Sequence, residues 1–239
     1  TRHLAERALR LGWATAEVQI SETETPLHRL ETVYRRITES LRTATVPPSA
    51  FRSVLDGWLF TLESDATEAD PALLHASDSD LSAAVERLME ARLAAVSSKT
   101  PAFAQALRGY RAASLTGEVA TADGLAAWIG GQPHVAASAK RSAGLRGDLD
   151  HFGAMAFLQG LLTVLKDAGH PGLLVVLDEV ETLQRVRGDV RDKALNALRQ
   201  LIDEVDSGRY PGLYLLITGT PAFFEGPSGL TRLPPLAQR

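Results

Sequence analysis

The sequence predicts an α/β fold in which a parallel β-sheet is interrupted by a long helical segment. Two apolar runs, Leu173–Leu177 and Leu213–Ile217, have the length of strands, and turn residues precede both. A run that is apolar on both faces is typical of a strand inside a parallel sheet. A helical pattern at Arg191–Val205 separates the two runs, and strands that alternate with helices favour a parallel arrangement.

The first forty residues predict a helix, a strand, a polar loop and a second helix. Arg2–Leu11 has apolar residues at helical spacing, and Gly12 is a suitable stop. Trp13–Ile20 alternates imperfectly and indicates a strand, and a polar loop follows it. Leu27–Leu41 has one apolar side and indicates an amphipathic helix. We assign residues 1–46 to the first part of the sheet core.

Residues 47–166 differ from the segments on either side. They are rich in Ala and Leu, have helical periodicity and show no strand pattern, so they predict a helical insertion between two strands of the sheet. The predicted organisation is therefore residues 1–46, 47–166 and 167–239. Within the insertion, the Gly/Ala/Ser-rich stretch 130–147 predicts an exposed loop. It carries Lys140, Arg141 and Arg146, which could contact a phosphate backbone or could simply be solvated.

Composition excludes several classes of function. The 239 residues include 45% hydrophobic and 23% charged residues, enough for one large core or two smaller ones. The net charge of −4 does not demand a nucleic-acid partner. Cysteine is absent, which excludes disulfides, thiolate catalysis and cysteine-ligated zinc. No stretch is long and apolar enough to cross a bilayer and no signal peptide is visible, so we expect a soluble, cytoplasmic protein.

The first chemical candidate is the acidic pair that ends the first apolar run, Asp178-Glu179. Open α/β sheets bind ligands at the carboxyl ends of their strands. Mg²⁺ prefers oxygen ligands and often takes only one or two protein carboxylates. Neighbouring residues at a strand end point in different directions, so one acid can hold metal-bound water while the other faces a different atom. The alternative is that the acid only caps the next helix.

Two further candidates follow the second apolar run. Thr218 and Thr220 carry hydroxyls that could position water or a phosphate oxygen, although Thr-Gly-Thr-Pro is also ordinary turn chemistry. Near the C-terminus, Arg232 or Arg239 could neutralise charge on a transferred phosphoryl group; the alternative is a solvated arginine.

The phosphate-cradling pattern G-x-x-x-x-G-K-[ST] is absent from the sequence. The one Lys-Thr pair, Lys99-Thr100, lacks the glycines and the preceding strand. The opening helix and strand fit the unit that follows such a loop, which would then lie a few residues before Thr1. The chain also ends at Arg239 without a turn signal, so we expect a fragment of a longer protein.

The chain resembles a known family over nearly its whole length. The matching segments, in chain order, are Leu27–Ile37, Ala126–Gly131, Gly172–Glu181, Ala194–Asp203, Ile217–Phe224 and Leu236–Arg239. They resemble the P-loop ATP-binding proteins of bacterial BREX phage-resistance systems (BrxD and, more distantly, BrxC and PglY), which are AAA+-like ATPases. The acid-ended strand alone is generic, whereas the Gly-Thr-Pro-x-Phe-Phe segment is more distinctive.

This resemblance implies a parallel-sheet P-loop NTPase (AAA+-like) core, truncated, with a large all-helical insertion. It implies ATP and Mg²⁺ as cofactors, Asp178 for the metal, Glu179 for water activation and Thr218 or Thr220 as the sensor. Arg239 would resemble a finger acting across subunits. DNA, other phage-defence proteins and further copies of the chain are the implied partners. The alternatives are a non-catalytic interaction module with a degenerate nucleotide fold and a signalling ATPase resembling STAND or origin-recognition proteins.

Overall fold

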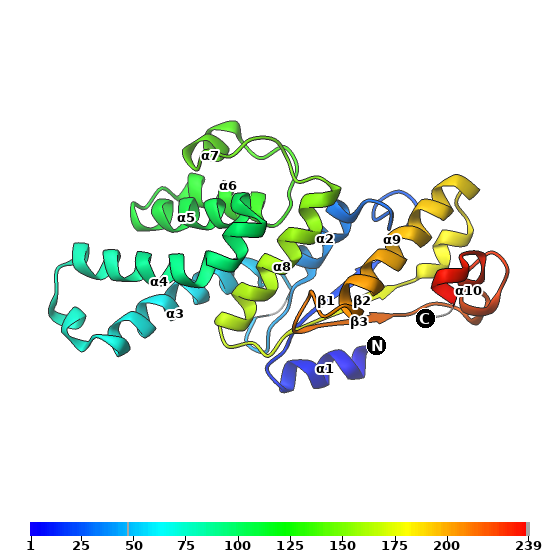
Figure 1. Cartoon of the computed structure of the whole chain (residues 1–239), viewed down its shortest axis with the longest axis horizontal. Coiled ribbons are helices and arrows are strands. Elements are labelled where there is room, and N and C mark those ends of the chain that lie inside the picture. The colour runs from blue at the N-terminus through cyan, green and yellow to red at the C-terminus, as the bar shows by residue number, and fades with distance from the viewer. Residues whose placement is uncertain (47, 238–239) are drawn as a thin grey trace.

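The computed structural model describes residues 1–46 and 48–237, and it joins a three-stranded sheet to a helical lobe (Figure 1). The strands are β1 (Ala14–Gln19), β2 (Leu173–Asp178) and β3 (Leu213–Ile217). The helices are α1 (Arg2–Arg10), α2 (Leu30–Ser40), α3 (Phe51–Ala69), α4 (Asp78–Lys99), α5 (Pro101–Leu115), α6 (Val119–Ile129), α7 (Ala137–Ser142), α8 (His151–Asp167), α9 (Gly188–Asp206), α10 (Pro221–Glu225) and α11 (Pro234–Ala237). Short 3-10 helices span Pro71–His75, Val180–Gln184 and Leu230–Arg232.

The three strands form one sheet in the order β1-β2-β3, and both pairings are parallel. Ala14, Leu173 and Leu213 lie in register across the sheet. The prediction of a parallel sheet built from these three segments is therefore confirmed, with β2 as the central strand. Each parallel connection carries at least one helix, because a parallel crossover must return the chain to the same end of the sheet.

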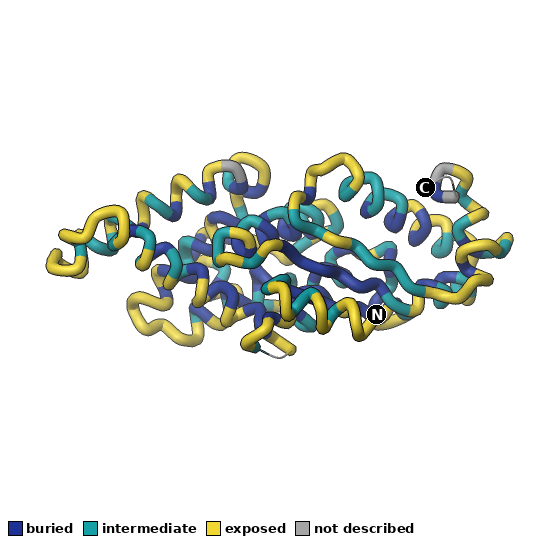
Figure 2. Tube along the Cα trace, turned by 90° about the horizontal axis from the view of Figure 1, so that it is seen from below, coloured by how far each residue is buried: buried dark blue, intermediate teal, exposed yellow. Residues whose placement is uncertain are grey.

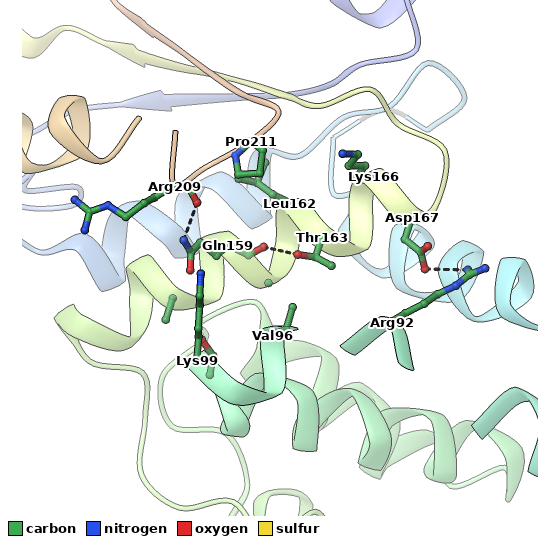
Figure 3. Close-up of a pocket in the computed structure, with 13 residues that line it drawn as sticks. Arg92, Val96, Lys99, Gln159, Leu162, Thr163, Lys166, Asp167, Arg209 and Pro211 are labelled. Carbon is green, nitrogen blue, oxygen red and sulfur yellow. Dashed lines mark hydrogen bonds and ion pairs between the residues drawn. The ribbon is translucent and has the colours of Figure 1, made fainter. Parts of the chain in front are cut away.

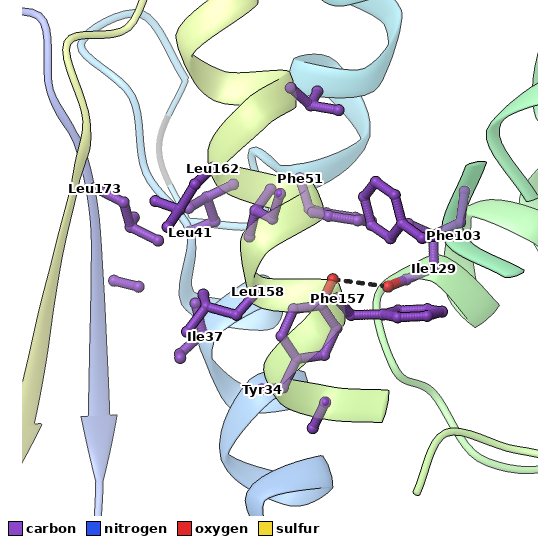
Figure 4. Close-up of a cluster of buried hydrophobic side chains, with 14 of the residues drawn as sticks. Tyr34, Ile37, Leu41, Phe51, Phe103, Ile129, Phe157, Leu158, Leu162 and Leu173 are labelled. Carbon is purple, nitrogen blue, oxygen red and sulfur yellow. Dashed lines mark hydrogen bonds between the residues drawn. The ribbon is translucent and has the colours of Figure 1, made fainter. Parts of the chain in front are cut away.

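One face of the sheet packs against α2 and α8. Ile37 of α2 and Leu158 of α8 meet Leu173 of β2 in this core, where all three are buried (Figure 4). The hydroxyl of Tyr34, also on α2, donates a hydrogen bond of 2.9 Å to the carbonyl of Ile129 at the end of α6. The same apolar cluster therefore continues from the sheet into the helical lobe.

The opposite face of the sheet is less covered. Figure 2 shows the molecule from this side, with buried strand residues in dark blue in the middle and the mostly exposed α1 running beside them near the N-terminus. No residue of α1 is buried, and Leu4 and Leu11 keep about half or more of their surface exposed. The edge strand β3 has four residues of intermediate burial and an exposed Tyr214.

The lobe comprises α3 to α7 and lies at the far end of the molecule from α9 and α10 (Figure 1). The described residues between 48 and 166 form only helices and loops, as the sequence predicts for the insertion. Helix α8 joins the lobe to the sheet, because Asp167 near its end accepts hydrogen bonds from Trp58 of α3 and Arg92 of α4. The division of the chain at residues 46 and 166 stays a prediction.

The prediction of a loop over residues 130–147 is wrong in part. The stretch contains α7, and Ala139 on that helix is buried against the lobe. Lys140 forms an ion pair of 3.0 Å with Asp148 and also donates to the carbonyl of Gly147. Only Arg141 and Arg146 of the three predicted cations remain exposed there without an ion pair among the described residues. Alanine spacing gave too weak a periodic signal for a helix this short to be predicted.

In the part of the chain that the structure describes, no helix is both long and apolar enough to span a membrane.

Candidate functional site

The tips of β2 and β3 bring together two of the residues that the sequence singles out. Asp178 ends β2, and its Oδ1 accepts hydrogen bonds from the hydroxyl of Thr218 and, at 3.0 Å, from the backbone N–H of Glu179. The backbone N–H of Thr218 also donates to the carbonyl of Leu177, at 2.9 Å. Asp178 and Thr218 are therefore neighbours at the same edge of the sheet, as the parallel arrangement predicts.

Glu179 has an unusual backbone conformation. Its φ of 59° and ψ of 36° lie in the left-handed region, which costs a residue with a side chain roughly 1–2 kcal/mol. This conformation ends the strand and starts the 3-10 helix Val180–Gln184, whose Thr182 N–H donates to the Glu179 carbonyl at 3.1 Å. The carboxylate of Glu179 is exposed, and no described residue forms an ion pair or hydrogen bond with it. The fold thus holds the backbone of Glu179 in a strained turn and leaves its acid free.

The segment after Glu179 is held by contacts that sequence reasoning missed. Arg191 of α9 donates to three carbonyls of this segment at 2.7 to 3.0 Å. Gln184 donates to the carbonyl of Ala222 in α10, at 3.0 Å. The hydroxyl of Thr182 reaches the carbonyl of Ile20 after β1, at 3.3 Å. No motif marks these residues. Gln184 and Thr182 act on the backbone of distant segments, and Arg191 acts on a turn just before its own helix.

Glu181 places a second carboxylate close to the strand tips. Its Oε2 is buried and has no hydrogen-bond partner among the described residues. A Cβ at Gly219, just beyond β3, would lie 3.1 Å from this oxygen and 2.8 Å from a methyl carbon of Val180. Glycine at this position therefore permits the close approach of the Glu181 segment to the tip of β3. A buried carboxylate oxygen without a partner is costly, so this oxygen is available to accept a ligand.

The structure does not bring the other predicted residues to this pair. Thr220 begins α10 without a side-chain capping bond and is exposed. Arg232 binds Asp192 of α9 through two hydrogen bonds of 2.5 and 3.1 Å. This interaction lowers the pKa of Asp192 and raises that of Arg232. Arg232 thus has a partner on α9, whereas Arg239 lies outside the described residues.

The described residues contain no group of three or more His, Cys, Asp or Glu side chains that could hold a metal ion by themselves. The acids at the strand tips could hold a cation only if other oxygen donors completed its coordination. Mg²⁺ is commonly bound in this way, by one or two carboxylates together with substrate phosphates and water.

A family model described as BREX system ATP-binding protein BrxC/D matches residues 1–239. No curated protein and no solved structure matches the chain.

Proposed function

Because the chain belongs to the family of BREX system ATP-binding proteins BrxC/D, we propose that its strand tips form the metal- and water-binding side of an ATP-hydrolysing site. The observation that carries the proposal is the acidic end of the central strand, where Thr218 of the neighbouring strand donates to Asp178 and Glu179 is left free. The family supplies ATP binding and a role in the BREX phage-defence system. The AAA+-like core, the hydrolysis and the residue roles are the proposal.

The donor chemistry at the strand tips fits Mg²⁺. Thr218 and the Glu179 N–H both donate to Oδ1 of Asp178, which leaves the Oδ2 atom without a hydrogen bond from a described residue. The buried Oε2 of Glu181 also lacks a partner. Carboxylate oxygens are the ligands that this hard cation prefers, so we assign the metal to Asp178, with Glu181 as a second acceptor nearby. When bound with ATP, Mg²⁺ would neutralise charge on the phosphates.

Other residues of this chain would activate water, orient the Asp178 carboxylate and sense the nucleotide. Glu179, exposed and unpaired, would accept a proton from the attacking water or polarise it. The Thr218 hydroxyl keeps the Asp178 carboxylate oriented and is placed where a sensor would follow the state of the nucleotide. Thr220 is the weaker sensor candidate because it does not contact the acids. Arg239 stays in the proposal as the residue that would reach ATP in a neighbouring copy.

A phosphate cradle is the part of the site that residues 1–239 do not provide. Such a cradle needs successive backbone N–H groups and a lysine, and the sequence lacks the corresponding glycine-rich pattern. We therefore expect residues 1–239 alone to bind ATP weakly or not at all. Calorimetry that gave micromolar ATP affinity for residues 1–239 would contradict this expectation.

The catalytic assignment is tested in the full-length protein with Glu179→Gln. An amide cannot accept the proton of the attacking water, so we expect ATP binding to persist while turnover falls by about 10²-fold or more. Glu225→Gln, on the exposed surface of α10, removes the same charge and should keep the parent rate. Hydrolysis by the Glu179→Gln variant at the parent rate would remove Glu179 from the mechanism.

In the proposal, turnover drives remodelling of DNA or of partner proteins.

A further inference from the structure

Two cavities lie along helix α8. The first, of about 560 Å³, lies between α8, the end of α4 and the segment before β3 (Figure 3). The second, of about 540 Å³, lies between α9, the start of α8 and the segment at His28. Arg209 lines both cavities, so they approach each other at this residue, and the two together are called the groove below.

The groove is basic in a chain whose net charge is −4. Its lining carries six cationic side chains and only three carboxylates, a local balance of +3. The cations come from α4, α8, α9 and the segment before β3; they are Arg92, Lys99, Lys166, Lys193, Arg199 and Arg209. Arg92 and Arg209 form ion pairs with carboxylates. The charge that is not matched in the groove therefore comes mainly from lysine.

The distribution of lysine makes the groove distinct from the rest of the surface. The sequence has four lysines, and three of them, Lys99, Lys166 and Lys193, line the groove. All three are exposed and have no ion pair among the described residues, whereas Lys140 is paired with Asp148. Lys99 and Lys166 lie in the last turns of α4 and α8, where a cation complements the helix dipole. Lys193 lies in the first half of α9, where the helix dipole does not favour a cation.

The end of the groove at the start of α8 adds an aromatic surface. Phe152 is 81% exposed, and its ring lies 5.4 Å from that of His151, which lines the second cavity. His28 lines the same cavity, and its pKa is lowered by burial and then by the charges of Arg29 and Lys193. Cationic groups crowd this end of the groove, and a bound anion would relieve their repulsion.

We propose that this groove binds a single strand of nucleic acid. The three lysines and Arg209 would contact successive phosphates, and the exposed ring of Phe152 would stack against a base. From His151 to Lys166 the groove follows fifteen residues of helix, or about 22 Å, which corresponds to about six phosphates at the spacing of one B-form strand. A small anion would occupy only one of the two cavities, whereas an extended polyanion uses both. Grooves that combine cations with an aromatic platform are typical of single-strand binding.

The test measures fluorescence anisotropy of a labelled 20-nucleotide oligo-dT with residues 1–239, without ATP, over a series of salt concentrations. We expect the parent to bind at low salt and the triple variant Lys99→Gln, Lys166→Gln, Lys193→Gln to flatten the slope of log K against log salt by about 2. The matched control, Arg7→Gln, Arg10→Gln, Arg87→Gln, removes the same charge from exposed residues outside the groove and should keep the parent slope. Thermal unfolding of both triple variants checks that they are folded.

Phe152→Leu sharpens the test because it keeps an apolar side chain and removes the ring. We expect it to weaken oligo-dT binding about tenfold with an unchanged salt slope, since stacking does not depend on counterion release. Absence of binding by the parent, or equal losses in the lysine variant and its control, would overturn the proposal. Equal affinity for a duplex of the same length would overturn the assignment to a single strand. Because ATP is absent, these outcomes are independent of the proposed hydrolysis.

Discussion

Strands β2 and β3 both follow a Pro-Gly pair and both begin with leucine, but they lie in different environments. Pro171-Gly172 precedes Leu173, and Pro211-Gly212 precedes Leu213. The five apolar residues of β2 are all buried, whereas β3 has four residues of intermediate burial and Tyr214 is 60% exposed. The strands differ because β2 lies between two neighbours, whereas β3 pairs on one side only in the part of the chain that the structure describes. The burial of an apolar strand is therefore decided by its position in the sheet, which its own sequence does not encode.

The two edges of the sheet extend this comparison. On the outer side of β1, Thr15 exchanges two backbone hydrogen bonds of 2.9 and 2.8 Å with Arg42. Among the residues that the structure describes, no strand pairs with the outer side of β3. An apolar edge without cover is a site where a further strand can pair. If the AAA+-like proposal is correct, the strand that carries the phosphate cradle would pair there.

The largest predicted difference is between two leucines that lie in register. Leu173→Ala removes a fully buried side chain and should lower the free energy of unfolding by about 3–4 kcal/mol. Leu213→Ala removes a partly exposed side chain and should cost about 1 kcal/mol. Urea unfolding of the two variants measures both costs. Equal costs would mean that β3 is as well covered in solution as β2, and the comparison would fail.

The glycines before the two strands give the next effect. A Cβ at Gly172 would lie 2.2 Å from the carbonyl oxygen of Gly212 and 2.7 Å from the Trp13 ring, so Gly172→Ala should cost about 2–3 kcal/mol. Gly212 has a φ of +87° and a more open surrounding, so Gly212→Ala should cost about 1–2 kcal/mol. Thermal unfolding of the two variants measures the stability cost of each substitution. A larger cost at Gly212 would show that backbone strain outweighs the close approach of the strands.

The sequence predicts the strands well and their surroundings poorly. The runs at β2 and β3 and the stop at Gly12 depend on local chemistry, and the structure has Gly12 at a positive φ. The juxtaposition of Asp178 and Thr218 follows from parallel topology alone. The contacts of Thr182 with Ile20 and of Gln184 with Ala222 join segments far apart in the chain, which periodicity does not report. The pairing of Lys140 with Asp148 spans only eight residues, but it depends on the turn after α7, which periodicity does not report either.

A smaller effect is expected at the strand tips. Thr218→Val removes the hydroxyl that donates to Asp178, and the loss of one hydrogen bond to a partly buried acid should cost about 1–2 kcal/mol. Thr220→Val is the matched control, because that hydroxyl makes no capping bond and the side chain is exposed. Urea unfolding should leave the control within about 0.5 kcal/mol of the parent. Equal stability costs for Thr218→Val and Thr220→Val would mean that the hydrogen bond from Thr218 to Asp178 does not stabilise the fold.

The smallest effect concerns how the chain enters β3. The hydroxyl of Tyr210 donates to the carbonyl of Met155 on α8 at 3.1 Å, and burial raises the pKa of Tyr210 to about 12. The folded state thus keeps the phenol proton that the unfolded chain loses near pH 10. The contribution of Tyr210 to stability is complete below pH 10 and is lost as the pH rises to about 12. The Tyr210→Phe variant should therefore lose less stability than the parent between pH 9.5 and pH 11.5, as measured by urea unfolding at each pH.

Tyr110 in the lobe, whose pKa burial also raises to about 12, titrates in both proteins, so the difference between them reports Tyr210 alone. If parent and variant lose the same stability over this range, the phenol of Tyr210 does not stabilise the segment before β3.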